Sequence, residues 1–364
     1  MENFDEYLRQ GEPNKTEKAK VWKTAIGLQQ VDGLTPSAYL IETARQNIEG
    51  DITLEEVKAR IEQYYQQHSL RSADDRTEEA DKVSARIAEI LSEQTFTFSP
   101  GAYLNIHQRL FAGIYPFAGV VRDYNITKKE WVLHGETVLY ASAGLLQETL
   151  AYDMEQEKKF NYKGLSEQEI VAHLASFVSN LWQIHLFGEG NTRTTAVFLI
   201  QYVRKLGFKK ANNDLFANHS WFFRNALVRA NYEDLSRGNY RTNEFLIFFL
   251  SNLLFQTQHP LRNRDMLIAA PNPGPGQVNE PVDTVNAPAD TVNDTVNNVP
   301  DTVNGPFTDT LLWLLQQNNQ LTTLDLSARL GLSLSTVKRK IKELKNSGKL
   351  ERLGSDKKGY WRVT

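Results

Sequence analysis

Residues 185–193 read His-Leu-Phe-Gly-Glu-Gly-Asn-Thr-Arg, a glycine-rich segment bounded by a histidine and an arginine. A helical pattern precedes this loop, and a second helix is predicted to begin at about Asn191. Free backbone N–H groups and the positive end of the helix dipole converge at such a helix start, so the loop is predicted to bind an anion. Gly188 and Gly190 would let the backbone approach a phosphate closely.

The side chains of the loop suit phosphoryl or nucleotidyl transfer. His185 is a titratable base near neutral pH, Glu189 offers a hard oxygen ligand for Mg²⁺, and Arg193 adds a guanidinium one turn into the helix. Either a lone histidine or a glycine-rich helix start is more often structural, but the combination favours chemistry. The loop is not a Walker A motif, because Lys and Ser/Thr are missing after its second glycine.

Helical periodicity dominates the chain on both sides of the loop. Ser166 and Glu169 form a predicted capping box, and apolar residues then recur at three- and four-residue steps up to Ile184. The helix after the loop is predicted to run to about Leu206, with Gly207 as its terminator. Residues 119–141 break this pattern. Residues 120–127 alternate loosely and residues 131–133 could supply a return strand, which predicts a short β-hairpin.

The motif at 185–193 resembles that of the Fic family, usually written H-P-F-x-D/E-G-N-G/K-R-x-x-R. Residues 115–126, Tyr-Pro-Phe-Ala-Gly-Val-Val-Arg-Asp-Tyr-Asn-Ile, resemble the segment that leads into the family's β-hairpin flap. The resemblance extends over about residues 90–255. It implies a mainly α-helical core with a short hairpin flap.

The resemblance implies a protein adenylyltransferase, which moves AMP from ATP to a Tyr, Ser or Thr hydroxyl of a target protein or of itself. His185 would be the general base, Phe187 a core anchor that shapes the loop, and Glu189 the Mg²⁺ ligand. The phosphates would be held by Gly188, Gly190, Asn191, Thr192 and Arg193. A flap of Asn125, Ile126, Thr127 and Lys128 would align an extended target segment through its main chain.

Three positions depart from the family motif. Leu186 replaces proline, Thr192 replaces glycine or lysine, and Ala196 replaces the second arginine. In the family that arginine anchors the γ-phosphate and pairs with an inhibitory glutamate. Arg204 or Arg229 would have to supply the missing charge.

Residues 1–75 are predicted to be helical and resemble the small antitoxin-type module that obstructs Fic sites. Its inhibitory pattern, S/T-x-x-x-E-G, places Asp32 where the glutamate belongs. A second alignment uses Glu49 and Gly50, and we favour Asp32. The alternative is that these helices only pack against the core.

The predicted core spans residues 76–267 and is followed by a linker. Residues 268–306 hold seven of the twelve prolines, no Lys or Arg and four copies of Asp-Thr-Val-Asn, which predicts disorder. Residues 307–364 carry eleven Lys or Arg against five Asp or Glu, a charge of +6 beside −9 for the rest. Apolar residues in this segment recur with the spacing of three short helices, which predicts a winged helix-turn-helix domain. Such a domain would bind DNA or dock to a protein, and the alternative is that its basic residues form only a solvated charged face. Its expected DNA contacts are Lys338, Arg339, Lys340, Lys342 and Lys345 on the third helix, and Lys357 and Lys358 at the wing tip.

Composition limits the remaining choices. The 364 residues contain no cysteine, which excludes disulfides and is compatible with a reducing cytosol. No stretch approaches the ~18 continuous apolar residues of a membrane span, so we expect a cytoplasmic protein without a membrane partner. A rival hypothesis is a DNA-binding regulator whose Fic core senses nucleotide without turnover. The oligomeric state, a homodimer included, stays open.

Overall fold

The computed structural model describes residues 4–67, 76–208 and 211–269, together with residues 312, 315, 319, 322–323, 326, 337, 341–342, 344–345, 348–353 and 360–363. The chain divides into two compact units, Met1–Val296 and Asn297–Thr364. Apart from its first two residues, the predicted linker at 268–306 lies outside the described residues. Ile268 is buried and donates its N–H to the carbonyl of Val132, so the packed part of the first unit extends at least to this residue.

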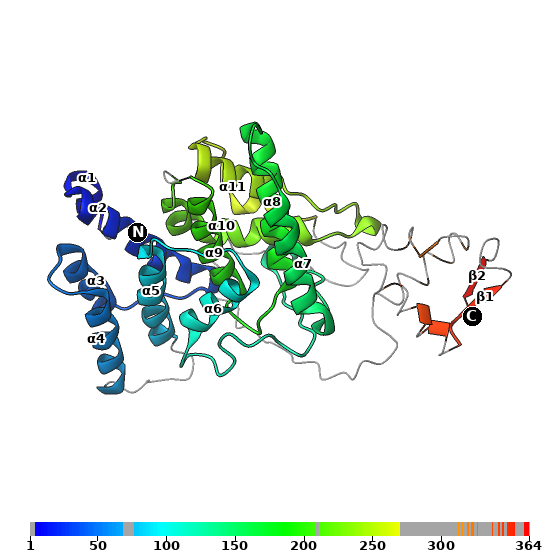
Figure 1. Ribbon diagram of the computed structural model, residues 1–364, viewed down its shortest axis with the longest axis horizontal. Coiled ribbons are helices and arrows are strands. Elements are labelled where there is room, and N and C mark those ends of the chain that lie inside the picture. The colour runs from blue at the N-terminus through cyan, green and yellow to red at the C-terminus, as the bar shows by residue number, and fades with distance from the viewer. Residues whose placement is uncertain are drawn as a thin grey trace, which may run out of the picture. The chain divides into compact units, whose positions relative to one another are not determined.

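The first unit is mainly α-helical, as predicted (Figure 1). Its α-helices are α1 (Asp5–Gln10), α2 (Pro13–Gly27), α3 (Ala38–Glu49), α4 (Leu54–Gln67), α5 (Thr77–Ser92), α6 (Pro100–Phe111), α7 (Leu146–Lys159), α8 (Glu167–Ile184), α9 (Asn191–Lys205), α10 (Asp214–Asn231) and α11 (Glu244–Phe255). Short 3-10 helices are η1 (Leu28–Asp32), η2 (Trp131–Leu133), η3 (Ala143–Leu145), η4 (Leu235–Arg237) and η5 (Asn263–Met266). None of the helices described is both long and apolar enough to cross a lipid bilayer.

The N-terminal helices pack directly on the rest of the first unit. Helix α2 lies against α5 and α10, and α4 lies against α5. The approach of α2 to α10 requires a glycine, because a Cβ on Gly27 would lie 2.2 Å from the Cα of Ala217. The hydroxyl of Ser220 also donates to the carbonyl of Gly27 at 2.9 Å. The segment predicted to be an inhibitory module is therefore fixed against α10.

Helices α8 and α9 hold the glycine-rich loop between them. The predicted capping box at Ser166 and Glu169 is confirmed, and α8 ends at Ile184, with α7 packed beside it (Figure 1). Helix α9 begins at Asn191, as predicted, and is buried from that residue to Val203. Because α9 lies inside the core, its first turn is fixed on all sides.

The segment predicted as a β-hairpin is a loop rather than a pair of strands. Residues 131–133, expected to form the return strand, are the 3-10 helix η2. The chain turns back where the N–H of Glu130 donates to the carbonyl of Glu136 at 3.0 Å. Side chains replace the rest of a strand ladder, since the N–H of Lys128 donates to the hydroxyl of Thr137. We call residues 123–142 the flap loop.

The second unit contains the predicted two-stranded wing. Strand β1 (Leu350–Leu353) pairs antiparallel with β2 (Tyr360–Val363) in the register Leu350 to Val363. The apolar residues whose spacing predicted the helices do form a core with the wing: Leu315, Leu326, Val337, Ile341, Leu344, Leu350 and Trp361.

Candidate active site

His185 sits at the end of α8 in a left-handed backbone conformation, with φ 51°. Its side chain is enclosed: the residue is 4% exposed, and its ring lies 4.1 Å from the ring of Tyr140, measured between centroids. Neither ring nitrogen has a hydrogen-bond partner in the described part of the chain. Burial, followed by the charges of Lys128, Arg122 and Arg224, holds the pKa of His185 well below its usual value. The imidazole is therefore neutral at physiological pH, and in this conformation it is a weaker base than the near-neutral titration expected from the sequence.

Arg193 is completely buried and is held by two carboxylates. Its Nε lies 2.6 Å from Oδ2 of Asp32 and its Nη2 lies 2.6 Å from Oε1 of Glu79. Gln29 and Tyr115 accept further hydrogen bonds from the same guanidinium, at 3.0 and 3.2 Å. Asp32 ends η1, in the N-terminal segment, whereas Glu79 lies in the first turn of α5. The charge expected to hold phosphate is thus neutralised by the protein itself.

Glu189 is paired with a lysine of the flap loop. Nζ of Lys128 lies 2.8 Å from Oε2 of Glu189, and the two side chains are only 9% and 16% exposed. Burial alone would raise the pKa of Glu189, but the Lys128 charge and the N–H of Gly190 lower it to about 2. No group of three or more His, Cys, Asp or Glu side chains gathers as a metal site among the described residues. A metal ion at this site would be coordinated by one ionised carboxylate, that of Glu189, and by oxygen atoms of a bound phosphate compound.

The remaining loop residues shape the backbone. The amide of Asn191 brackets the peptide of Phe187, accepting from its N–H at 3.0 Å and donating to its carbonyl at 2.7 Å. Phe187 is fully buried, and the hydroxyl of Thr192 accepts from the indole N–H of Trp182 at 3.0 Å. Asn191 and Thr192, expected to hold phosphate, bond within the protein in this conformation.

Aromatic side chains pack closely against both glycines of the loop and leave little room for a Cβ. Gly190 has φ 78°, and a Cβ there would lie 2.4 Å from the ring of Phe111. A Cβ on Gly188 would lie 2.6 Å from the hydroxyl of Tyr124. Gly190 therefore excludes larger residues for packing and backbone reasons, whether or not a phosphate binds, whereas a larger residue at 188 would require the Tyr124 hydroxyl to shift.

The four predicted flap residues differ in their surroundings. Ile126 is buried in the core and Thr127 is exposed. The side-chain oxygen of Asn125 accepts from the N–H of Ala143 at 3.0 Å, and Lys128 reaches Glu189. The prediction assigned Lys128 a main-chain role, but its side chain enters the loop.

His107, on α6, supports the loop and was not identified from the sequence. Its Nδ1 accepts from the N–H of Gly119 at 2.8 Å, so its Nε2 carries the proton and donates to the carbonyl of Glu189 at 3.0 Å. Its ring stacks on Phe187. Burial, the main cause, lowers the pKa of His107 to about 4. A single histidine within a helical pattern does not indicate that its side chain will contact a distant loop.

We expect the protonation of His107 to make stability fall in acid. Below about pH 6.5 the unfolded chain binds a proton at this residue, whereas the folded chain does not until about pH 4. The free energy of unfolding should therefore decrease as the pH falls through this window, by up to about 3 kcal/mol. Denaturation measured between these two pH values should show a shallower decrease in His107→Gln than in the wild type. Equal slopes would contradict the assignment.

The arginines proposed to replace the missing one at position 196 are not at the loop. Arg204 donates to the carbonyls of Leu91 and Glu93, and no contact joins Arg229 to the loop in the part of the chain that the structure describes. Arg224, on α10, is another positively charged residue close to the loop. Its Nη2 lies 3.0 Å from Oε2 of Glu130 in the flap loop, and its charge acts on Asp32, Glu189 and His185.

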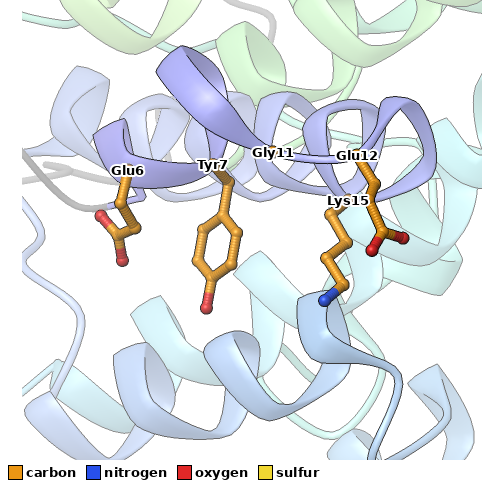
Figure 2. A pocket seen from close by; sticks show the side chains of 5 residues that line it. All are labelled: Glu6, Tyr7, Gly11, Glu12 and Lys15. Atoms are coloured by element: carbon orange, nitrogen blue, oxygen red, sulfur yellow. The ribbon is translucent and has the colours of Figure 1, made fainter.

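Glu49, the second acidic candidate, lies elsewhere. Its carboxylate is 2.7 Å from Nζ of Lys15. Lys15 also lines a pocket of about 240 Å³ with Glu6, Tyr7, Gly11 and Glu12. Figure 2 shows the side chains of Glu6, Tyr7, Glu12 and Lys15 extending toward the same side. Of the two acids, Asp32 is the one that contacts Arg193.

Two of the expected DNA contacts can be placed. Lys342 and Lys345 are exposed, as a phosphate-binding face requires. Lys338, Arg339, Lys340, Lys357 and Lys358 lie outside the described residues.

The fold and the loop define a helical domain in which a glycine-rich loop leads into a buried helix. The model of the Fic/DOC family matches residues 97–203, from just before α6 almost to the end of α9, so this part of the chain is a Fic/DOC family domain. A winged helix-turn-helix DNA-binding family matches residues 310–351. The matched Fic/DOC region includes Lys128, Glu189 and Arg193, but neither Asp32 nor Glu79.

Solved structures that are similar to this chain include two proteins with a Fic domain. One is the N-terminal FIC domain of Bep8, a VirB-translocated effector from Bartonella sp. 1-1C, at 20% identity over 52% of this chain and 88% of that one, with a TM-score of 0.38. The other is a Fic family protein from Desulfovibrio desulfuricans G20, at 14% identity over 100% and 93%, with a TM-score of 0.41. No curated protein sequence matches.

Proposed function

We propose that this chain is a protein adenylyltransferase that transfers AMP from ATP to a Tyr, Ser or Thr hydroxyl of a target protein. The observation that supports this most is a neutral, buried imidazole in the same Fic/DOC-family loop as an ionised carboxylate and a guanidinium. The present conformation is the inhibited one, because the cation and the anion of the loop are each already paired.

The residues of the loop fit ATP and Mg²⁺ chemically. The ion pairs seen here are stand-ins for such a ligand: the ammonium of Lys128 lies where a metal cation would meet Glu189, and the carboxylates of Asp32 and Glu79 lie where phosphates would meet Arg193. Mg²⁺ is commonly held by one or two carboxylates together with substrate phosphates, which suits a single Glu189. Bound in this way, the metal would neutralise phosphate charge.

Each loop residue then has a defined part in the transfer. His185 accepts the proton of the target hydroxyl, whose oxygen forms a bond to the α-phosphorus of ATP. The bond from that phosphorus to the bridging oxygen breaks, and pyrophosphate leaves with the electron pair. Arg193 and the N–H groups at the start of α9 hold the phosphates in line. The flap loop holds the target segment.

An experiment with α-labelled ATP tests the proposal. The protein is incubated with the labelled ATP, Mg²⁺ and a cell lysate. Labelled protein should form with His185 present and should not form when His185 is replaced. The rival hypothesis is a DNA-binding regulator with a nucleotide-sensing core. Two features support it: Ala196, which is buried, stands in place of the second arginine, and the charged groups of the loop are already paired. It predicts that nucleotide alters DNA binding while no His185-dependent label forms.

Removing Asp32 should activate the enzyme. Asp32→Ala leaves Arg193 with one carboxylate instead of two, so phosphate competes for the guanidinium more easily. We expect the initial rate of labelling at low ATP to rise about 5–150-fold, the usual range of a coupling between two sites. Glu49→Ala is the matched control and should leave the rate unchanged, since Glu49 pairs with Lys15. If neither variant is faster than the wild type, Asp32 is not inhibitory.

The winged helix supports a second activity, binding of duplex DNA. We expect the full chain to bind with an affinity that falls steeply with salt, because lysines displace counterions from phosphates. Replacing both Lys342 and Lys345 by alanine should weaken binding and reduce the salt slope by about 1 for each phosphate that is no longer neutralised. Replacing Lys158 and Lys159 on α7 makes the same change of charge in the first unit. An equal loss of affinity in both double variants would indicate only a general charge effect.

A further inference from the structure

The buried guanidinium of Arg122 joins the flap loop to the end of α8. Arg122 is 5% exposed, and the hydrogen bonds that its side chain makes to the described residues all go to backbone carbonyls. On the α8 side, its Nε donates to the carbonyl of His185 at 2.7 Å and its Nη2 to that of Ile184 at 3.3 Å. On the flap side, Nη2 donates to the carbonyl of Ala141 at 2.6 Å and Nη1 to that of Tyr124. One side chain therefore ties both arms of the flap loop to the residue expected to be the base.

The contacts of Arg122 stabilise the backbone at His185 and at the end of α8. The last carbonyls of a helix lack partners within it, and a cation near them is favourable because of the helix dipole. His185 also has a left-handed backbone, at φ 51°, which is unfavourable for a residue other than glycine and persists only when the surroundings enforce it. The backbone N–H of Arg122 adds a further constraint, since it donates to the carbonyl of Leu186 at 3.0 Å.

A second set of bonds runs between the same two segments. The side-chain amide of Gln183 donates to the carbonyl of Leu139 at 2.9 Å, and its backbone carbonyl accepts from the N–H of Ala141 at 3.3 Å. The return arm of the flap loop is thus aligned with the last turn of α8. Gln183 can be lost without breaking the link that Arg122 makes to the first arm, at Tyr124.

We propose that Arg122 is a positioning residue, which sets the distance between a target segment on the flap loop and the imidazole of His185. The inference rests on the proposed transfer reaction. Arg122 touches neither ATP nor the target; it acts by holding the backbone of His185 and both arms of the flap loop in one frame. Its loss should lower kcat and leave the affinity for ATP nearly unchanged, because the phosphates are held by α9.

The test compares Arg122→Met and Arg122→Lys with Arg204→Met, in the wild type and in the Asp32→Ala background. Arg204 is a matched control, since it also donates to two backbone carbonyls but at Leu91 and Glu93. Hydrogen exchange of peptides covering residues 120–142 and 182–193 should become faster in Arg122→Met and not in Arg204→Met. In the Asp32→Ala background, kcat should fall about 100-fold, as expected for a misplaced reacting group, with the Kd for ATP unchanged. Arg122→Lys should lie between, because an ammonium cannot span four carbonyls.

Exchange in Arg122→Met equal to that in Arg204→Met would overturn the proposal, and so would a loss of ATP affinity that accounts for the whole loss of rate. If Arg122→Met does not fold, Arg122→Lys carries both measurements. Absence of transfer in the Asp32→Ala parent would instead contradict the proposed function, and the exchange experiment would still decide whether Arg122 holds the two segments together.

Discussion

Replacing His185 by alanine is expected to lower the rate of AMP transfer by about 10²–10⁴-fold, the usual contribution of a general base. The reason is the environment of the imidazole. It is buried and neutral, and neither of its nitrogens bonds to another described residue, so the lone pair that would accept the proton of the target hydroxyl is not occupied by another group. The measurement is the rate of label transfer from α-labelled ATP in the Asp32→Ala background.

The control for His185→Ala is a histidine of the same unit outside the loop. His259 stacks on Phe248 and lies in no contact with the site among the described residues. His259→Ala should keep the parent rate. Calorimetric titration with ATP should give similar affinities for both variants, because His185 is expected to act on the target hydroxyl rather than on the phosphates. If His185→Ala keeps the parent rate, His185 is not the general base.

Replacing Arg193 by methionine is expected to destabilise the protein by about 3–5 kcal/mol, the range for breaking a buried ion pair from one side. The variant leaves the carboxylates of Asp32 and Glu79 facing a buried apolar side chain. The ring of Phe111 also loses the guanidinium that lies 4.7 Å from its centroid. Chemical denaturation of the full chain measures the loss.

Two further variants separate this effect from a general loss of charge. Arg237→Met removes an arginine that is 43% exposed and pairs with Glu136 and Asp234, so it should destabilise the protein far less than Arg193→Met. Adding Asp32→Asn to Arg193→Met should recover part of the stability, because one of the unpaired carboxylates is then neutral. A loss in Arg193→Met no larger than in Arg237→Met would mean that the buried cluster contributes little.

Local patterns predicted the parts of the site that adjacent residues determine. The capping box at Ser166 and the start of α9 at Asn191 follow from neighbours along the chain, and both are confirmed. The same holds for the wing at the C-terminus. Asp32, preferred to Glu49 on an alignment of short patterns, is the acid that reaches the loop. Asp32 pairs with Arg193, whereas the position of the second arginine of the family motif is occupied here by Ala196.

The contacts that close the site depend on tertiary packing and could not be read from the chain. Glu79 and Arg193 are separated by 114 positions, and Lys128 and Glu189 by 61. Each is an ordinary charged residue in its own segment. His107 likewise gave no signal, since its partners are backbone groups of two other segments.

The predicted hairpin failed for a physical reason. β-Branched residues such as Ile126 suggested strands, but here Ile126 is buried by packing and the two arms are joined through side chains. Arg122 and Thr137 make bonds that a ladder would otherwise supply. A propensity for extended structure was therefore satisfied without a sheet.

Label position in the Asp32→Ala variant tests most directly whether the loop transfers AMP. The purified protein is incubated with Mg²⁺ and a lysate, in parallel with ATP labelled at the α-phosphate or at the γ-phosphate. We predict that protein retains the α label, that it does not retain the γ label, and that adding His185→Ala removes the signal. Retention of the γ label, or an α signal that survives the loss of His185, would contradict AMP transfer by this site.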